Sequence, residues 1–438
     1  MPNESDLASF GPFARGANNL AREDSVPQQA FRRGINVDVY PGGKTRRRKG
    51  YSVLLDTALK NIWSGDGEYG LCTSADASTL YHVDPTVGLT ELYNGFRPES
   101  EIAYCLVNDT VCVSDGATML RVGTADSSVR PWGVPRPAGN PVLSAVDGGL
   151  APGDYQIAIT YATLDREESG ADTASYISLP NGGGIRCQLA DFPTDTHVAS
   201  INVYVTAAGG EELRWYGTYP RGALDIVVSN GRRGRPLHTM GLDQMPAGEI
   251  LAFAGGRLLC AIDNLLLFSP SLYYGLTDVV RNYFAYAGRI DMVAPAQPAG
   301  ASTGIFVAAG GKTYFLNMAD GNVANATNPI AYHVGAVRGA PTYIDGAALG
   351  MDGVPAQPVP MWLAKNGMPC VGLPSGQVIA LTNLRYQMDI GDRVSIAQRE
   401  LAGINQTIIG VRNPQVGSVA RPADVPEVTL IRNGIEIP

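Results

Sequence analysis

Apolar and polar residues alternate along most of this chain in short runs that are separated by turn-forming residues. In the first third, the runs lie at 34–40, 44–55, 70–73, 78–83, 89–93, 102–107, 110–114 and 118–122. Asn108-Asp109 and Asp115-Gly116 are tight-turn sequences between the last three runs. Apolar residues three and four positions apart, the helical pattern, are scarce. Consecutive hairpins of short strands are typical of β-propeller blades.

The pattern changes in the middle of the chain. Residues 124–140 are rich in proline and predict an extended linker. About seven alternating strands follow, at 141–147, 153–163, 173–179, 184–189, 198–206, 212–218 and 223–229. Seven short strands at this spacing indicate a small sandwich of the fibronectin-III type.

Hairpins resume beyond residue 245. The runs 250–254, 257–262 and 265–269 are joined by Gly255-Gly256 and Asp263-Asn264, and further pairs occur near 304–316 and 360–381. Residues 384–402 fit a helix or a strand. The blades show no strict repeat and are therefore expected to be divergent.

The sequence thus predicts an all-β chain, a β-propeller-like body of divergent blades with an inserted fibronectin-III-like β-sandwich. We expect an N-terminal arm at 1–30, the first part of the body at 31–136, the sandwich at 137–240 and the second part at 241–438. The 52 glycines and 30 prolines among 438 residues supply the turns.

Composition and sequence pattern bear on the cellular compartment in which the protein is made. No apolar run has the ~18 residues of a membrane-spanning helix, and the first residues do not have the pattern of a secretory signal. The six cysteines form no CxxC pair, and most lie in strand-like apolar runs, so we expect buried thiols in a reducing compartment. These features favour synthesis in a cytosol.

Charge is unevenly distributed. The chain has 33 Lys and Arg against 41 Asp and Glu, a net charge of −8. Outside residues 31–50 there are 26 cations and 40 acids, a net charge of −14. Within that stretch, the cations are Arg32, Arg33, Lys44, Arg46, Arg47, Arg48 and Lys49, beside one acid. This basic segment predicts a contact with another subunit or with DNA, while the alternative is a hairpin edge protected by charge.

Chemistry-bearing motifs do not emerge from the sequence. Gly310-Gly311-Lys312-Thr313 ends like a phosphate-binding loop, but Phe306 occupies the position where that motif needs its first glycine. We find no nucleophile elbow and no clustered metal ligands, and we expect no catalytic residue, cofactor or metal. The Glu167-Glu168-Ser169 stretch fits a structural turn. The aromatic run from Tyr273 to Tyr286 fits sugar stacking, a subunit interface or blade core.

Several short segments resemble virion proteins of tailed bacteriophages. The start of the chain, Phe13 to Leu20, is followed by Phe31 to Val39 and by Arg47-Arg48-Lys49-Gly50-Tyr51. Later segments near 246–250, 256–258, 268–275 and 304–316 are similar to the blades of such proteins, and the sandwich resembles their fibronectin-like insert. The resemblance is to the nozzle or hub proteins of short tails.

That resemblance implies a non-enzymatic structural protein of the phage tail. It implies self-association into a ring, commonly a hexamer, that extends the tail channel for passing DNA and docks neighbouring tail or head–tail adaptor proteins. An acidic body suits such a channel because it repels phosphates. The protein would then be made in the host cytoplasm and located in the virion.

Two other functions remain open from the sequence. One is a glycan-binding or glycan-degrading propeller, which would require a cleft lined by aromatic rings and, for hydrolysis, two neighbouring carboxylates. The other is a cytosolic propeller scaffold that stays monomeric.

Overall fold

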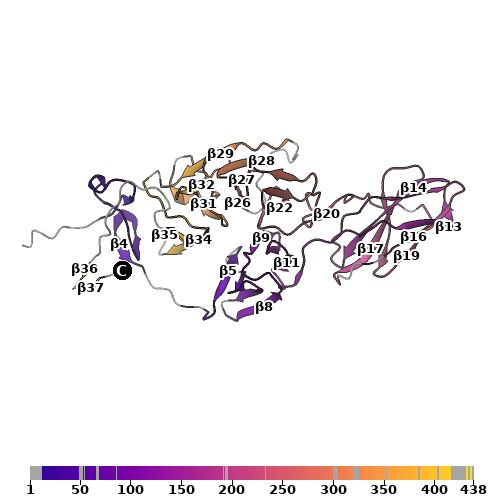
Figure 1. Cartoon of the computed structure of the whole chain (residues 1–438), viewed down its shortest axis with the longest axis horizontal. Coiled ribbons are helices and arrows are strands. Elements are labelled where there is room, and N and C mark those ends of the chain that lie inside the picture. Colours follow the sequence, from indigo (N-terminus) through magenta and orange to yellow (C-terminus); the bar gives the residue numbers. More distant parts are fainter. Residues whose placement is uncertain are drawn as a thin grey trace, which may run out of the picture. The chain divides into compact units, whose positions relative to one another are not determined.

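The structure is a computed structural model of the chain (Figure 1). It describes residues 12–48, 53, 55–65, 69–84, 86–190, 192, 196–231, 233–298, 304–318, 325–351, 353–382, 385–401, 404–415, 431–432 and 435–436. Contacts divide the chain into two compact units, one of residues 57–290 and 299–302 and the other of residues 1–56, 291–298 and 303–438. Regular structure in the described residues is strand, apart from short 3-10 turns. Among these residues we find no helix with the length and apolarity of a membrane span.

Outside its middle part, residues 142–228, the unit of residues 57–290 contains three antiparallel sheets of four strands each in its described residues. The first has β5 (Leu59–Ser64), β6 (Gly70–Ser74), β7 (Thr79–Asp84) and β8 (Gly88–Asn94). The second has β9 (Ala103–Val107), β10 (Thr110–Ser114), β11 (Met119–Gly123) and β12 (Val129–Pro131). The third has β21 (Ile250–Ala254), β22 (Arg257–Ile262), β23 (Leu265–Phe268) and β25 (Tyr283–Ala285), beside a short ladder of β20 (Asp243–Gln244) and β24 (Leu276–Thr277). Asn108 and Asp263 take positive φ values of 57° and 50° in the expected hairpin turns.

Consecutive sheets in this unit pack against each other through their apolar faces. Leu71 and Leu80 of the first sheet share a buried cluster with Val111, Val113 and Leu120 of the second. A separate cluster joins the second and third sheets, and its members are Cys105, Val107, Cys112, Met119, Trp132, Met245, Leu251, Leu258, Cys260 and Leu267. Strand β10 is almost entirely buried because its two faces belong to these two clusters, with Val111 and Val113 in one and Cys112 in the other. Meander sheets that pack face to face are the building principle of propeller blades.

The other unit repeats the same pattern. One four-stranded sheet has β26 (Ile290–Pro295), β27 (Gly304–Ala309), β28 (Lys312–Asn317) and β29 (Ile330–Tyr332), and the next has β30 (Thr342–Asp345), β31 (Pro358–Leu363), β32 (Pro369–Gly372) and β33 (Val378–Ala380). Phe306, Trp362 and Cys370 share the buried cluster between them. Two-stranded ladders follow, of β34 (Arg393–Leu401) with β35 (Ile404–Arg412) and of β36 (Ile431–Arg432) with β37 (Ile435–Glu436). The Gly310-Gly311 sequence is a hairpin turn that pairs Ala309 with Lys312, as expected.

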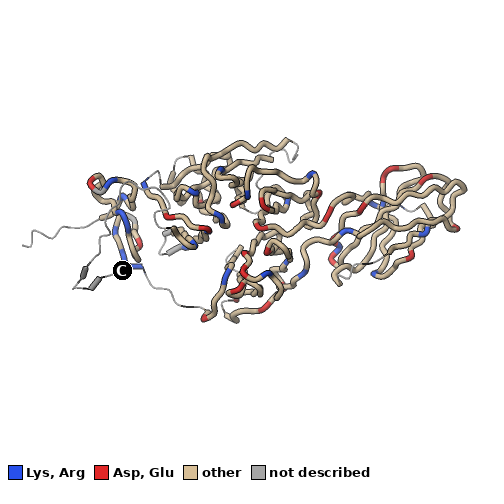
Figure 2. The backbone as a smooth tube through the Cα atoms, in the orientation of Figure 1, with Lys and Arg blue, Asp and Glu red and all other residues tan. Residues whose placement is uncertain are grey.

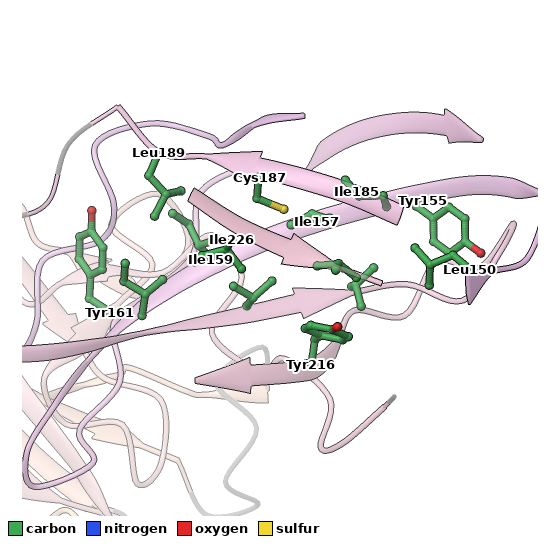
Figure 3. Close-up of a cluster of buried hydrophobic side chains, with 14 of the residues drawn as sticks. Leu150, Tyr155, Ile157, Ile159, Tyr161, Ile185, Cys187, Leu189, Tyr216 and Ile226 are labelled. Atoms are coloured by element: carbon green, nitrogen blue, oxygen red, sulfur yellow. The ribbon is translucent and has the colours of Figure 1, made fainter. Parts of the chain in front are cut away.

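The middle of the chain folds as a seven-stranded sandwich. Its strands are β13 (Val142–Leu150), β14 (Gly153–Thr163), β15 (Ser175–Leu179), β16 (Gly183–Gln188), β17 (Val198–Val205), β18 (Arg214–Pro220) and β19 (Asp225–Val228). The sheet β13-β16-β19 faces the sheet β15-β14-β17-β18. Figure 3 shows the core between them, where Ile157, Ile159, Ile185 and Cys187 alternate inward from β14 and β16. The predicted fold class is therefore confirmed: an all-β chain with blade-type sheets and an inserted sandwich.

The two connections of the sandwich lie next to each other. The indole Nε1 of Trp132 donates to the carbonyl oxygen of Tyr274 at 3.0 Å, and Nε2 of Gln244 donates to the carbonyl oxygen of Trp132 at 2.8 Å. A Cβ on Gly133 would lie 2.3 Å from the carbonyl oxygen of Gly275, and Gly133 has a φ of 73°. Close backbone approach therefore requires glycine where the chain enters the sandwich.

The described part of the predicted N-terminal arm is folded onto its own unit. β1 (Gly16–Ala17) pairs in parallel with β2 (Ala30–Phe31), and β3 (Val37–Val39) forms a hairpin with β4 (Thr45–Arg47). This hairpin is shorter than the predicted 34–40 and 44–55, since Asn36 takes a φ of 55° just before β3. Residues 1–11 and most of 49–54 lie outside the described residues.

One asparagine connects this N-terminal segment to a distant part of the chain. The buried Asn19 donates from Nδ2 to the carbonyl oxygen of Gln387 at 2.8 Å and accepts from the backbone N–H of Gln387 at 3.0 Å. Its backbone N–H also donates to the carbonyl oxygen of Arg385. The side-chain amide of Asn19 therefore bonds to both backbone groups of Gln387, as a residue of a neighbouring strand would.

We expect Asn19→Asp to reduce the free energy of unfolding by about 1–3 kcal/mol, because the carbonyl of Gln387 loses its donor. Asn18→Asp is the matched control: Oδ1 of Asn18 accepts from the backbone N–H of Ala21, and a carboxylate keeps that acceptor. Chemical denaturation of both variants measures the difference. Equal stability of the two variants would contradict the role of the amide donor.

Candidate functional site

The seven predicted contact residues of the basic segment differ in their surroundings. Arg32 donates to the carbonyl oxygens of Ala21 and Asn19, at 3.1 and 3.5 Å. Nε of Arg48 donates to Oδ1 of Asp38 at 3.0 Å. These two arginines therefore stabilise the fold of the segment.

Asp38 is the acid at the centre of the hairpin. Its side chain is 5% exposed and accepts from Arg48, while Nη2 of Arg399 lies 3.7 Å from its other oxygen. Because Arg399 belongs to β34, the buried carboxylate links the basic hairpin to the strand pair β34–β35 of the same unit.

The remaining cations point to solvent. Lys44, Arg46 and Arg47 are exposed, and all three residues of β4 have exposed side chains. Figure 2 shows Lys and Arg gathered along this hairpin. No ion pair joins Lys44, Arg46 or Arg47 to another described residue. Arg33 is also exposed, and Lys49 lies outside the described residues. The hairpin thus presents an exposed basic strand.

A second feature is a cleft in the unit of residues 57–290, with a volume of about 320 Å³. It lies where the base of the sandwich meets the sheet β9–β12 and the loop before β24. Its lining residues are Val107, Asn108, Asp109, Thr110, Arg121, Trp132, Asp165, Arg166, Glu167, Glu168, Arg235, Leu272, Tyr273, Tyr274, Gly275 and Leu276.

Ion pairs close one side of this cleft. The two terminal nitrogens of Arg121 on β11 contact Asp165 at 2.8 Å and Glu167 at 3.2 Å. Arg130 on β12 also pairs with Asp165. These contacts hold the β14–β15 loop of the sandwich against the blade sheet, in addition to the connections around Trp132.

Glu168, the next residue, is the acceptor of a buried network. It accepts from Nδ2 of Asn202 at 2.8 Å, from the hydroxyl of Tyr204 at 2.6 Å and from Nη2 of Arg235 at 2.6 Å, and also from the hydroxyl of Thr160. Its side chain is 8% exposed. The carboxylate therefore joins β14 and β17 to the segment that leaves the sandwich.

The sequence marks the individual parts of this cleft but not their assembly. The interpretation of Glu167-Glu168-Ser169 as a structural turn agrees with the hydrogen bonds of Glu168. Sugar stacking is one of the interpretations that the sequence allows for the aromatic run from Tyr273. The structure brings Asp165, Glu167 and Glu168 together with Tyr273 and Tyr274 in one cleft. The sequence signals for this cleft are the pairs Glu167-Glu168 and Tyr273-Tyr274, which lie about a hundred positions apart.

The six cysteines are buried and free, as expected from their apolar runs. Burial raises the pKa of the thiols of Cys105, Cys187, Cys260 and Cys370 to about 12. Thiols with such pKa values are unreactive at neutral pH.

Comparisons with known proteins give only distant likenesses. No protein-family profile matches the chain, and no curated protein matches it. A streptogramin B lyase structure is 9% identical with a TM-score of 0.31, covering 78% of this chain and 86% of that chain. YCF48 from Cyanidioschyzon merolae is 12% identical with a TM-score of 0.31, covering 78% and 91%. Kluyveromyces lactis Hsv2 is 9% identical with a TM-score of 0.28, covering 85% and 88%. Likenesses at these TM-scores support no statement about the activity of this chain.

We expect Glu168→Gln to lower the free energy of unfolding by about 3 kcal/mol. The substitution replaces one accepting carboxylate oxygen by an NH2 group among buried donors, and Arg235 loses its counter-charge. Glu212→Gln is the control, since Glu212 forms an exposed pair with Arg214 worth less than about 1 kcal/mol. Urea denaturation measures both. A Glu168 variant as stable as the Glu212 variant would contradict the network.

The pH dependence of stability tests the pairing of Glu167. Burial raises the pKa of Glu167 above its ordinary 4.5, and the charge of Arg121 lowers it in part. Because the folded-state pKa is raised, the stabilising contribution of the uncharged carboxyl is complete below pH 4.5 and is lost as the pH rises through that pKa.

In Arg121→Gln the pKa of Glu167 rises further. We therefore expect the unfolding free energy of this variant to fall more steeply than that of the wild type between about pH 4.5 and neutral pH. Adding Glu167→Gln removes the titrating group and should restore a flatter curve. Denaturation at a series of pH values measures the slopes, and parallel curves for the wild type and Arg121→Gln would refute the coupling.

Proposed function

We propose that this chain is a structural virion protein of a tailed bacteriophage, which assembles into a ring that extends the tail channel. The proposal builds on the resemblance of its opening segment and blade segments to nozzle and hub proteins. The blade-type sheets and the sandwich inserted between two of them are compatible with that origin. No chemical step is required of such a protein.

The exposed basic strand β4 is the observation that carries the proposal. Its residues Thr45, Arg46 and Arg47 are all exposed, and in the described residues β4 pairs with β3 on one edge only. The chain outside residues 31–50 has a net charge of −14. A basic strand edge on an otherwise acidic chain is complementary to a second copy of the same chain.

Such a contact joins two different surfaces, the basic hairpin of one copy and an acidic surface of the next. Contacts of this heterologous type generate closed rings when the rotation between subunits allows closure. The acidic remainder would then repel the phosphates of passing DNA. In this account, neighbouring tail or head–tail adaptor proteins dock onto the ring in the virion.

The double variant Arg46→Glu/Arg47→Glu tests the contact. We expect it to remain folded, because both side chains are exposed, and to lose ring assembly, measured as oligomer mass and by negative-stain images. The matched control is Arg281→Glu, which changes a side chain that is 85% exposed on another surface.

Two results separate the possible roles of the hairpin. Loss of assembly with the Arg46/Arg47 variant, together with normal assembly of the Arg281 variant, supports a subunit contact. Normal assembly of the Arg46/Arg47 variant, with reduced DNA retention in particles, would contradict the subunit contact and assign the hairpin to DNA.

A further inference from the structure

We infer that the cleft at the base of the sandwich binds a short neutral saccharide. The inference rests on the lining of this cleft and is independent of ring assembly. With a volume of about 320 Å³, the cleft lies within the range of small-molecule sites. It differs from the basic hairpin in position and in chemistry.

The charge of the lining favours an uncharged ligand. Three arginines and four carboxylates line the cleft, a formal charge of −1. Arg121 pairs with Asp165 and Glu167. Arg130 also pairs with Asp165, and Arg235 pairs with Glu168. A lining with so little net charge does not attract a phosphate or a polycation strongly. A polyol, in contrast, is bound through hydrogen-bond donors and acceptors and needs no net charge.

Hydrogen-bonding residues also line the cleft beside these pairs. Asn108 and Asp109 come from the β9–β10 turn, and Arg166 comes from the β14–β15 loop. All three are exposed, and neither Asp109 nor Arg166 forms an ion pair with any described residue. An amide, a carboxylate and a guanidinium supply both the donors and the acceptors that sugar hydroxyl groups require.

Aromatic residues form another part of the lining. Tyr273 and Tyr274 are half-buried neighbours in the loop before β24. The ring of Tyr274 packs edge-on against Phe253, with centroids 5.2 Å apart, which leaves Tyr273 as the candidate for stacking on a ligand. Tyrosine offers a flat apolar face together with a hydroxyl group, which suits the apolar face and the hydroxyl rim of a sugar ring.

Backbone strain gathers around the same cleft. Arg166 and Leu272 have positive φ values of 66° and 69°, and both line it. Leucine rarely adopts this conformation, and Leu272 is 80% exposed, so little local burial compensates for it. Strained residues of this kind cluster at ligand sites, where the fold holds them in place.

Saturation-transfer NMR and calorimetric titration of the full-length protein test the inference, with glucose, galactose, N-acetylglucosamine, maltose and lactose as probes. We expect saturable binding of at least one sugar. Tyr273→Ala should weaken it about tenfold. Tyr283→Ala is the matched control, because Tyr283 is 41% exposed on β25 and does not line the cleft.

Arg166→Gln is a second variant that keeps the fold, since its side chain is exposed, and it should also weaken binding while Arg281→Gln leaves it unchanged. The melting temperature of each variant shows that it is folded. Absence of saturable binding by all five sugars would overturn the inference. It would be overturned equally by the same affinity in Tyr273→Ala and the wild type, or by inorganic phosphate competing with the sugar for the cleft.

Discussion

The junction at which the sandwich leaves and rejoins the chain sets the structure of the unit of residues 57–290. A domain inserted between two packed sheets must enter and leave at nearly the same point, or the sheets would be forced apart. The indole of Trp132, the amide of Gln244 and the close approach of Gly133 to Gly275 meet this requirement with backbone hydrogen bonds. The ion pairs of Arg121 add a second attachment, and the cleft lies between the two.

Charged side chains serve two purposes in this protein. Asp38 and Glu168 are nearly buried. Asp38 accepts from Arg48 and forms an ion pair with Arg399, and Glu168 accepts from several partners. Burying a carboxylate is tolerated here because its partners compensate for the loss of water. Lys44, Arg46 and Arg47, in contrast, remain exposed and are the charges available for partners. Among the described cations of this segment, Arg32 and Arg48 therefore stabilise its fold, whereas Lys44, Arg46 and Arg47 can contact another molecule.

Local sequence patterns were sufficient for the strands and turns. The turns at Asn108 and at Gly310 depend on two residues each, and the alternation of β14 and β17 was clear, so these elements could be predicted. Residues 384–402 fit a helix or a strand; the structure has strand β34 over Arg393–Leu401, because its partner β35 pairs with it along its whole length.

Contacts between distant residues could not be predicted. The bonds of Asn19 cross 368 positions, and nothing near Asn19 or Gln387 indicates the other. The same limit applies to the cleft, whose lining comes from six separate segments between Val107 and Leu276. A sequence shows which side chains could bind a ligand, but only the packing of the sheets brings them to one place.

The mass of the purified full-length protein in solution, with negative-stain images of the same peak, tests the proposed assembly most directly. The account predicts a closed ring with a central hole, formed by the protein itself or on addition of neighbouring tail proteins. A protein that stays monomeric under both conditions would contradict it.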